Sequence, residues 1–180
     1  MGGSGFELAG IVDRPDDRER FPVAVLTHCF TCTKDLKSIV RISRGLAERG
    51  VAVLRYDMTG LGGSAGDFSR TNFSTNVADL RSAIRYASHQ LGPVTALIGH
   101  SFGGAASLAV AGGMDQAKSI EHAVASITPQ LGAVVTLAAP SETPHLAHLL
   151  VRMNPEIETA GVGSVTIGER RLKIRQQMLN

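Results

Sequence analysis

The chain has 180 residues, which favours a single domain, and 43% hydrophobic with 19% charged residues is typical of a globular protein with a proper core. The net charge of +2, with basic and acidic residues interleaved, argues against nucleic acid or an anionic membrane as a partner. No apolar run reaches transmembrane length and residues 1–5 lack the plan of a signal peptide, so we expect a cytoplasmic location.

The first part of the chain predicts strands that alternate with a helix. Residues 6–12 are a weak strand candidate, whereas residues 23–27 form a continuous apolar run that is typical of a central strand. Thr33 is placed to cap a helix whose apolar residues keep the helical period as far as Gly50. Residues 51–56 predict the next strand.

A glycine-rich stretch follows at residues 57–66. It does not match a dinucleotide-binding loop, because Ala65 stands where the third glycine belongs and four further residues precede the next helix. We therefore predict a mobile or substrate-lining loop without a phosphate-binding role.

The most informative stretch comes after a helix predicted at residues 74–91 and a buried strand predicted at residues 94–98. It reads Gly99-His100-Ser101-Phe102-Gly103 and is followed by small residues that suit a packed helix. Strand, Gly-x-Ser-x-Gly and helix in this order are typical of a nucleophile elbow, in which the glycines make room for a sharp turn around the serine.

The remaining chain predicts a helix at residues 114–127, a last core strand at 132–138 and a short helix at 145–153. Residues 162–167 and 170–174 alternate around a Gly-Glu pair and predict a small hairpin. Strands that alternate with helices predict an α/β fold with a mostly parallel sheet flanked by helices.

Ligands of such sheets bind at the carboxyl ends of the strands. Four polar residues follow directly on predicted strands, and we expect them on this rim: His28, Asp57, Ser101 and Glu142.

From about residue 23 to residue 139 the sequence resembles the α/β-hydrolase fold, incomplete at the C-terminus. It is more closely similar to hydrolase modules that occur fused to an osmotically inducible protein C (OsmC) domain, and residues 28–35, 57–62 and 71–80 carry this likeness. Residues 140–180 resemble the helix and hairpin insertion of these modules.

The resemblance implies a single hydrolase-like domain that needs no cofactor and acts on an ester or small amide. It implies Ser101 as the nucleophile, with the backbone N–H groups of Phe102 and Phe30 as oxyanion donors. Cys29 stands where hydrolases carry a glycine, which is a departure from the pattern.

The family places its triad acid and histidine after two further strands, and neither strand follows here. The sequence therefore resembles a truncated module, whose full-length protein would carry an OsmC-type domain. Glu142 and His145 have the right order for an acid and a base, but both come from one short segment, and a local contact at a helix start is the plainer interpretation. We interpret His28 and His100 as structural residues that bridge backbone groups beside tight turns.

Cys29 and Cys32 have the spacing of a redox pair between a strand and a helix, although the rest of the chain does not follow a thioredoxin-like fold. We expect two free thiols, and no second Cys or His pair indicates a metal site.

Two functional hypotheses remain open. The first is a serine hydrolase module, weak or inactive in the absence of its base. The second is a non-catalytic module that associates with a partner, or with a second copy as a homodimer, through an exposed sheet edge.

Overall fold

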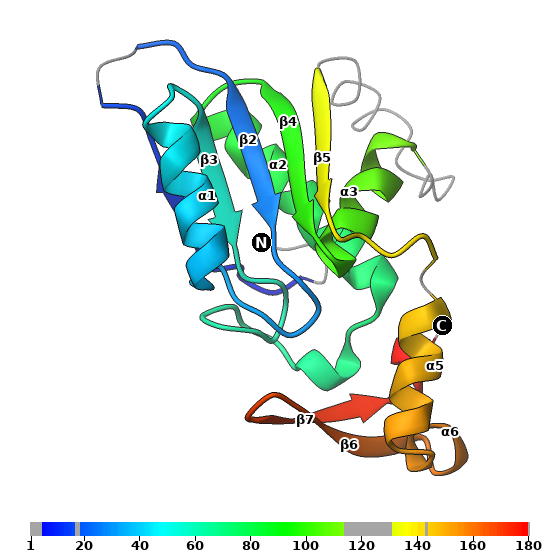
Figure 1. Cartoon of the computed structure of the whole chain (residues 1–180). Helices are drawn as coiled ribbons and strands as arrows, with labels where there is room; N and C mark the ends of the chain where they lie inside the picture. Colours follow the sequence, from blue (N-terminus) through cyan, green and yellow to red (C-terminus); the bar gives the residue numbers. More distant parts are fainter. Residues whose placement is uncertain (1–4, 17–18, 114–130, 143, 180) are drawn as a thin grey trace.

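The computed structural model describes residues 5–16, 19–113, 131–142 and 144–179. Its main sheet has five strands in the order β1-β3-β2-β4-β5 (Figure 1). Among these, β1 is antiparallel to β3 and every other pair is parallel, which confirms the predicted mostly parallel sheet. The strands span Gly10–Asp13 (β1), Val23–Thr27 (β2), Ala52–Tyr56 (β3), Val94–His100 (β4) and Ala133–Leu137 (β5).

Helices cover both faces of this sheet. Helix α1 (Lys37–Ala47) lies on one face, and α2 (Phe73–Gln90) and α3 (Phe102–Ala111) lie on the other (Figure 1). Alternate residues of β2 point to opposite faces, so Val25 joins the larger hydrophobic core with α2 and α3, while Leu26 joins a smaller core under α1. The sheet with its two cores fixes the rim on which the site lies.

A second, smaller unit lies below the carboxyl ends of the strands (Figure 1). It contains α5 (Pro144–Met153), α6 (Glu156–Thr159), the hairpin β6 (Val162–Ile167) and β7 (Arg170–Arg175), and a 3-10 turn at Gln176–Leu179. The predicted helix and hairpin are thus confirmed, with β7 one residue longer. Five hydrophobic residues of this unit are buried: Leu150, Ile157, Val165, Ile174 and Met178.

The beginnings of two elements differ from their predictions. The first strand is Gly10–Asp13 and not residues 6–12, because the chain before it bonds to the glycine-rich loop: Ala65 N–H donates to the Glu7 carbonyl at 2.9 Å. Thr33 does not cap α1, which begins at Lys37 without a side-chain cap. The Lys34 N–H is bound instead to the carboxylate of Asp57, so the chain forms a separate turn ahead of the helix.

The loop at residues 57–66, predicted to be mobile or substrate-lining, is packed into the protein over its first half. Asp57, Met58, Thr59 and Leu61 are all buried. At Gly60 φ is +74°, and a Cβ there would collide with the backbone of Phe68. Residues 57–61 are therefore packed against the body of the protein, while most of residues 62–66 are exposed.

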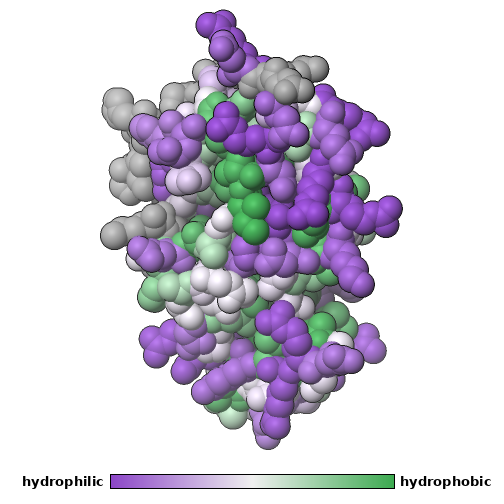
Figure 2. All heavy atoms as spheres, turned by 90° about the vertical axis from the view of Figure 1, so that its left-hand side faces the viewer, coloured by the Kyte–Doolittle hydropathy of each residue, from purple (hydrophilic) through white to green (hydrophobic). Residues whose placement is uncertain are grey.

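The predicted core strand at residues 132–138 is a strand but not a buried one. β5 is an edge strand, with Val135 45% and Leu137 37% exposed. The face on the β1 side, by contrast, carries mostly hydrophilic side chains around a narrow hydrophobic strip (Figure 2). The helix predicted at residues 114–127 lies outside the described residues, and no helix within them is long and apolar enough to cross a membrane.

Candidate functional site

Ser101 stands in a strained turn between β4 and α3. Its φ of 52° and ψ of −118° are unusual for a residue with a side chain, and it precedes the first residue of the helix. Its N–H donates to the Leu137 carbonyl at 2.8 Å, and its own carbonyl accepts from Gly104 at 2.8 Å. Ala138, the other described non-glycine residue with positive φ, directly follows the neighbouring strand β5. Strain of this kind collects at functional sites, because the surrounding structure must enforce it.

The glycines around Ser101 are required by space. A Cβ at Gly99 would collide with the backbone of Gly103, and a Cβ at Gly103 would collide with the carbonyl groups of Thr27 and His28. The start of α3 therefore lies in direct contact with the loop that leaves β2. This close approach brings the start of the loop, at His28, against the first turn of α3 that follows the serine.

Phe30 and Phe102 lie together across this contact. Their rings meet edge to face with centroids 5.7 Å apart, and Phe68 and Phe73 extend the aromatic cluster at 5.3 Å and 5.2 Å. No described residue accepts a hydrogen bond from the Phe30 N–H, and Phe102 is the first residue of α3, where a helix leaves its N–H groups without intrahelical acceptors. Neither N–H is therefore engaged by an acceptor in the described part of the chain.

His28 bridges two backbone groups, as predicted for a structural histidine. It is fully buried, its Nδ1 donates to the Cys29 carbonyl at 2.7 Å, and its Nε2 accepts from the Met58 N–H at 3.1 Å. Burial lowers the pKa of His28, and the bond to Cys29 opposes that shift only in part. The result is a neutral ring that joins the loop after β2 (residues 28–34, the β2 loop) to the loop after β3 (residues 57–66, the β3 loop).

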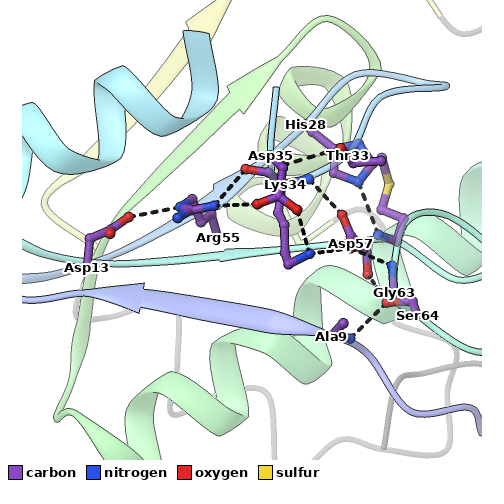
Figure 3. Close-up of polar contacts among 11 residues, drawn as sticks. Ala9, Asp13, His28, Thr33, Lys34, Asp35, Arg55, Asp57, Gly63 and Ser64 are labelled. Atoms are coloured by element: carbon purple, nitrogen blue, oxygen red, sulfur yellow. Dashed lines mark hydrogen bonds and ion pairs between the residues drawn. The ribbon is translucent and has the colours of Figure 1, made fainter. Parts of the chain in front are cut away.

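A polar network extends from the β3 loop (Figure 3). The buried carboxylate of Asp57 accepts from the N–H of Lys34 at 2.6 Å, from Lys34 Nζ at 2.9 Å and from Gly63 N–H at 2.9 Å. Hydrogen bonds to Asp35 and to Asp57 raise the pKa of Lys34. Since each acceptor of Asp57 is engaged with structural groups, this carboxylate holds the rim together.

The network continues through Arg55, which is 3% exposed. Arg55 Nε donates to Asp13 at 2.8 Å, and its Nη1 donates to the Lys34 carbonyl at 2.9 Å and to Asp35 at 3.1 Å. Burial works to raise the pKa of Asp13, but its bonds to Arg55 and Ser43 outweigh burial and lower it. The first strand, the β2 loop and the start of α1 are thereby joined.

Sequence reasoning missed much of this network. An arginine inside the apolar run of residues 51–56 is the signal for Arg55, since a buried cation needs partners. Asp79, an acidic residue within the helix predicted at residues 74–91, is buried, and it accepts the Thr59 N–H at 2.8 Å. Its helical spacing gave no sign of this.

The structure does not bring the two weaker site candidates to the serine. Glu142 and His145 are exposed, and no hydrogen bond joins either residue to Ser101 in the part of the chain described. His100 is not a backbone bridge at Nδ1, which is buried without a hydrogen-bond partner. The described residues contain no group of three potential metal ligands.

Cys29 and Cys32 form a disulfide, so the expectation of two free thiols is wrong. A tight turn explains the pairing: Cys32 N–H donates to the Cys29 carbonyl at 3.1 Å, and the two Cα atoms lie 5.3 Å apart.

A cavity of about 290 Å³ lies between β1 and α2, lined by residues that include Leu8, Tyr56, Ser82 and Tyr86. None of the residues that line it belongs to the elbow or to the β2 loop. It is therefore separate from the Ser101 site.

Solved structures with the same fold are numerous. Over 97% of its length the chain matches 66% of Est1E from Butyrivibrio proteoclasticus, a structure with bound ferulic acid, at 25% identity and a TM-score of 0.74. Over 96% it matches 66% of the esterase domain of a Rhodothermus marinus protein, at 36% identity and a TM-score of 0.61. Mouse α/β hydrolase domain-containing protein 10 shares the fold, with 19% identity, a TM-score of 0.66, and 97% and 64% of the two chains covered.

The chain thus spans about two thirds of the length of these proteins. No curated protein sequence matches it. The sequence model of one family, described as serine aminopeptidase S33, matches residues 26–178. With this match over most of the chain and with the sheet described above, the protein belongs to the serine aminopeptidase S33 family of α/β-hydrolases.

Proposed function

We propose that this chain carries the nucleophile and the oxyanion hole of a serine hydrolase that cleaves esters by acyl transfer. The observation that supports it most is the strained backbone of Ser101 at the start of α3, held between glycines that admit no side chain. A serine in such a turn presents its Oγ to solvent beside the positive end of a helix dipole.

In the proposed reaction, Ser101 Oγ attacks the carbonyl carbon of the substrate while a base takes the hydroxyl proton. The N–H groups of Phe102 and Phe30 donate to the oxyanion that forms. The tetrahedral intermediate collapses, the alcohol leaves with a proton, and the acyl group stays on Ser101 until water releases it as the acid.

The base of this reaction comes from outside the described residues in our proposal. Glu142 and His145 are exposed and make no hydrogen bond with Ser101. The edge strand β5 leaves room for further strands, either from a longer chain or from a second subunit. The likeness to fused hydrolase modules suggests an OsmC-type domain as a further part of the full-length protein. We propose that this protein acts in the cytoplasm.

Two substrate classes follow from the relatives. The neighbours that are esterases, one of them with bound ferulic acid, favour an ester, while the family description as an aminopeptidase favours an amide. We favour the ester, because an alcohol leaves more easily than an amine when the base that would protonate the leaving group is missing.

A second candidate function is association without catalysis. Val135 and Leu137 on the β5 edge expose apolar side chains that a partner strand or a second copy would cover. This candidate predicts a stable complex and no reaction at Ser101.

An acylation experiment distinguishes the two candidates. We expect p-nitrophenyl acetate to leave one acetyl group on Ser101, detectable by intact mass and peptide mapping, because deacylation is slow without a base. An amino-acid p-nitroanilide should leave none. Ser101→Ala should show no acylation, and equal acylation of this variant would refute the proposal.

His145→Ala provides the control for an internal base. We expect this variant to acylate and deacylate as the unmodified chain does, with negligible turnover in both. Rapid turnover that disappears in His145→Ala would show that Glu142 and His145 complete the site.

A further inference from the structure

The Cys29–Cys32 disulfide encloses the loop residue that the proposed function uses. Phe30 and Thr31 are the two residues between the cysteines, and Phe30 carries the N–H that we assign to the oxyanion hole. We propose that Cys29 and Cys32 form a reversible thiol–disulfide site whose oxidised form fixes the position of the Phe30 N–H. The disulfide itself is the evidence for the redox site. Its effect on the reactivity of Ser101 rests on the proposed function.

The two ends of this loop are held by other contacts. On one side His28 bonds to the Cys29 carbonyl and to Met58 N–H, and on the other side Lys34 N–H bonds to Asp57. The Phe30 ring is 8% exposed and packs on Phe68 and Phe102. Opening the disulfide therefore leaves the fold of the loop in place.

The turn between the two cysteines is held by hydrogen bonds as well as by the disulfide. Cys32 N–H donates to the Cys29 carbonyl at 3.1 Å, and Arg170 Nη1 donates to the Thr31 carbonyl at 2.6 Å. The Phe30 N–H has no acceptor among the described residues, and its direction is set through the carbonyl of the same planar peptide group, that of Cys29, which accepts from His28 Nδ1 at 2.7 Å and from Cys32 N–H at 3.1 Å. The disulfide closes the turn that makes the second of these bonds, so its loss weakens one of the two hydrogen bonds that orient the donor, and a less firmly held donor is less well preorganised.

Both cysteines are partly exposed, so a small thiol can reach the disulfide. In the reduction, a dithiol attacks one sulfur, the Cys29–Cys32 bond breaks, and a second attack within the reductant releases it as a cyclic disulfide. Two electrons and two protons pass to the protein as two thiols. A hydroperoxide reverses the step: hydrogen peroxide takes up two electrons and the two thiol protons, giving two waters and the disulfide.

The cysteines are the only two in the sequence, which makes the site simple to isolate. In a reducing cytoplasm, disulfides of this kind are commonly transient or redox-sensing. The chemical partners that we propose are therefore small dithiols or dithiol proteins as reductants, and hydroperoxides as oxidants.

The first measurement does not depend on catalysis. Intact mass after dithiothreitol, and again after hydrogen peroxide, should show a gain and then a loss of two hydrogens. Amide hydrogen exchange should rise about tenfold or more at Cys32 on reduction, and stay unchanged at Lys34 and Met58. Resistance of the disulfide to dithiothreitol, or exchange at Cys32 that is equal in both states, would overturn the inference.

The second measurement links the site to Ser101. When the disulfide is reduced, acylation of Ser101 by p-nitrophenyl acetate should slow by at least about threefold. The slowing should not exceed roughly 100-fold, which is the effect of losing one oxyanion donor completely. The double variant Cys29→Ser/Cys32→Ser should acylate at the rate of the reduced protein, and dithiothreitol should not change that rate. Equal rates in both redox states would overturn the coupling, whereas no acylation in either state would refute the proposed function and leave the exchange result standing.

Discussion

The two sides of the Ser101 rim differ in how completely they are built. On the side of β2 and β3, the loops after the strands are joined by three buried residues, His28, Asp57 and Arg55. On the side of β5, the strand is an exposed edge, and Glu142 and His145 lie in solvent. The difference teaches that the proposed nucleophile and the proposed oxyanion donors are held by contacts within the described chain, while no acid or base is held beside them there.

The largest effect is expected where the elbow touches the β2 loop. Gly103→Ala places a methyl group against the carbonyl groups of Thr27 and His28, and neither backbone can retreat. We expect a loss of about 3 kcal/mol or more in the free energy of unfolding, measured by urea denaturation.

Gly45→Ala is the matched control for this change. Gly45 lies inside α1, and its added Cβ would meet only the end of Arg49 at an ordinary 3.7 Å. We expect this variant to be as stable as the unmodified chain or up to about 1 kcal/mol more stable. Equal losses in both variants would show that the elbow contact is not special.

A somewhat smaller effect is expected at the buried carboxylate. Asp57→Asn keeps the shape of the side chain but leaves Lys34 Nζ without its buried partner. The loss should be about 2–3 kcal/mol in the free energy of unfolding. Asp35→Asn removes the exposed partner of the same lysine and should cost less than about 1 kcal/mol, so a reversed order would contradict the assigned roles.

The buried histidine predicts a dependence of stability on pH. The pKa of His28 lies below its ordinary value of 6.5, so the unfolded chain binds a proton before the folded chain does. The free energy of unfolding should therefore fall as the pH decreases below about 6.5, with a slope of at most about 1.4 kcal/mol per pH unit. His28→Gln should lose this slope, and His89→Gln, at an exposed position, should keep it.

The smallest effect on stability is expected on the open side. Val135→Lys on the exposed edge of β5 should change the free energy of unfolding by less than about 0.5 kcal/mol, yet it should abolish any self-association seen by sedimentation. Tyr86→Lys, on α2 and 55% exposed, should leave that association unchanged. Association that survives Val135→Lys would place the contact elsewhere.

The side of β2 and β3, with the elbow, was the easier one to predict from the sequence, but only where neighbouring residues carry the signal. A short apolar strand, two glycines around Ser101 and a run of small residues suffice to predict the elbow, because the steric limits act between neighbours in the chain. The contact of Asp57 with Lys34 spans 23 positions and arises only when parallel strands bring their loops together. No pattern among neighbouring residues predicts a contact between two side chains so far apart in the sequence.

Two errors have a common physical cause. An apolar run predicts a buried strand, but whether β5 is covered depends on what packs beside it. Likewise the spacing of Cys29 and Cys32 shows that they can pair, while the turn that brings their Cα atoms to 5.3 Å belongs to the folded loop. Both outcomes are properties of the assembled structure.

Labelling with a fluorophosphonate probe tests the central claim most directly. The account predicts slow phosphonylation of Ser101 alone, since the turn and the proposed oxyanion donors are in place and the described residues set no base beside the serine. Peptide mapping should find the adduct on Ser101, and Ser101→Ala should remain unlabelled. Failure of Ser101 to react more than the exposed serines of the chain, or undiminished labelling of Ser101→Ala, would contradict the account.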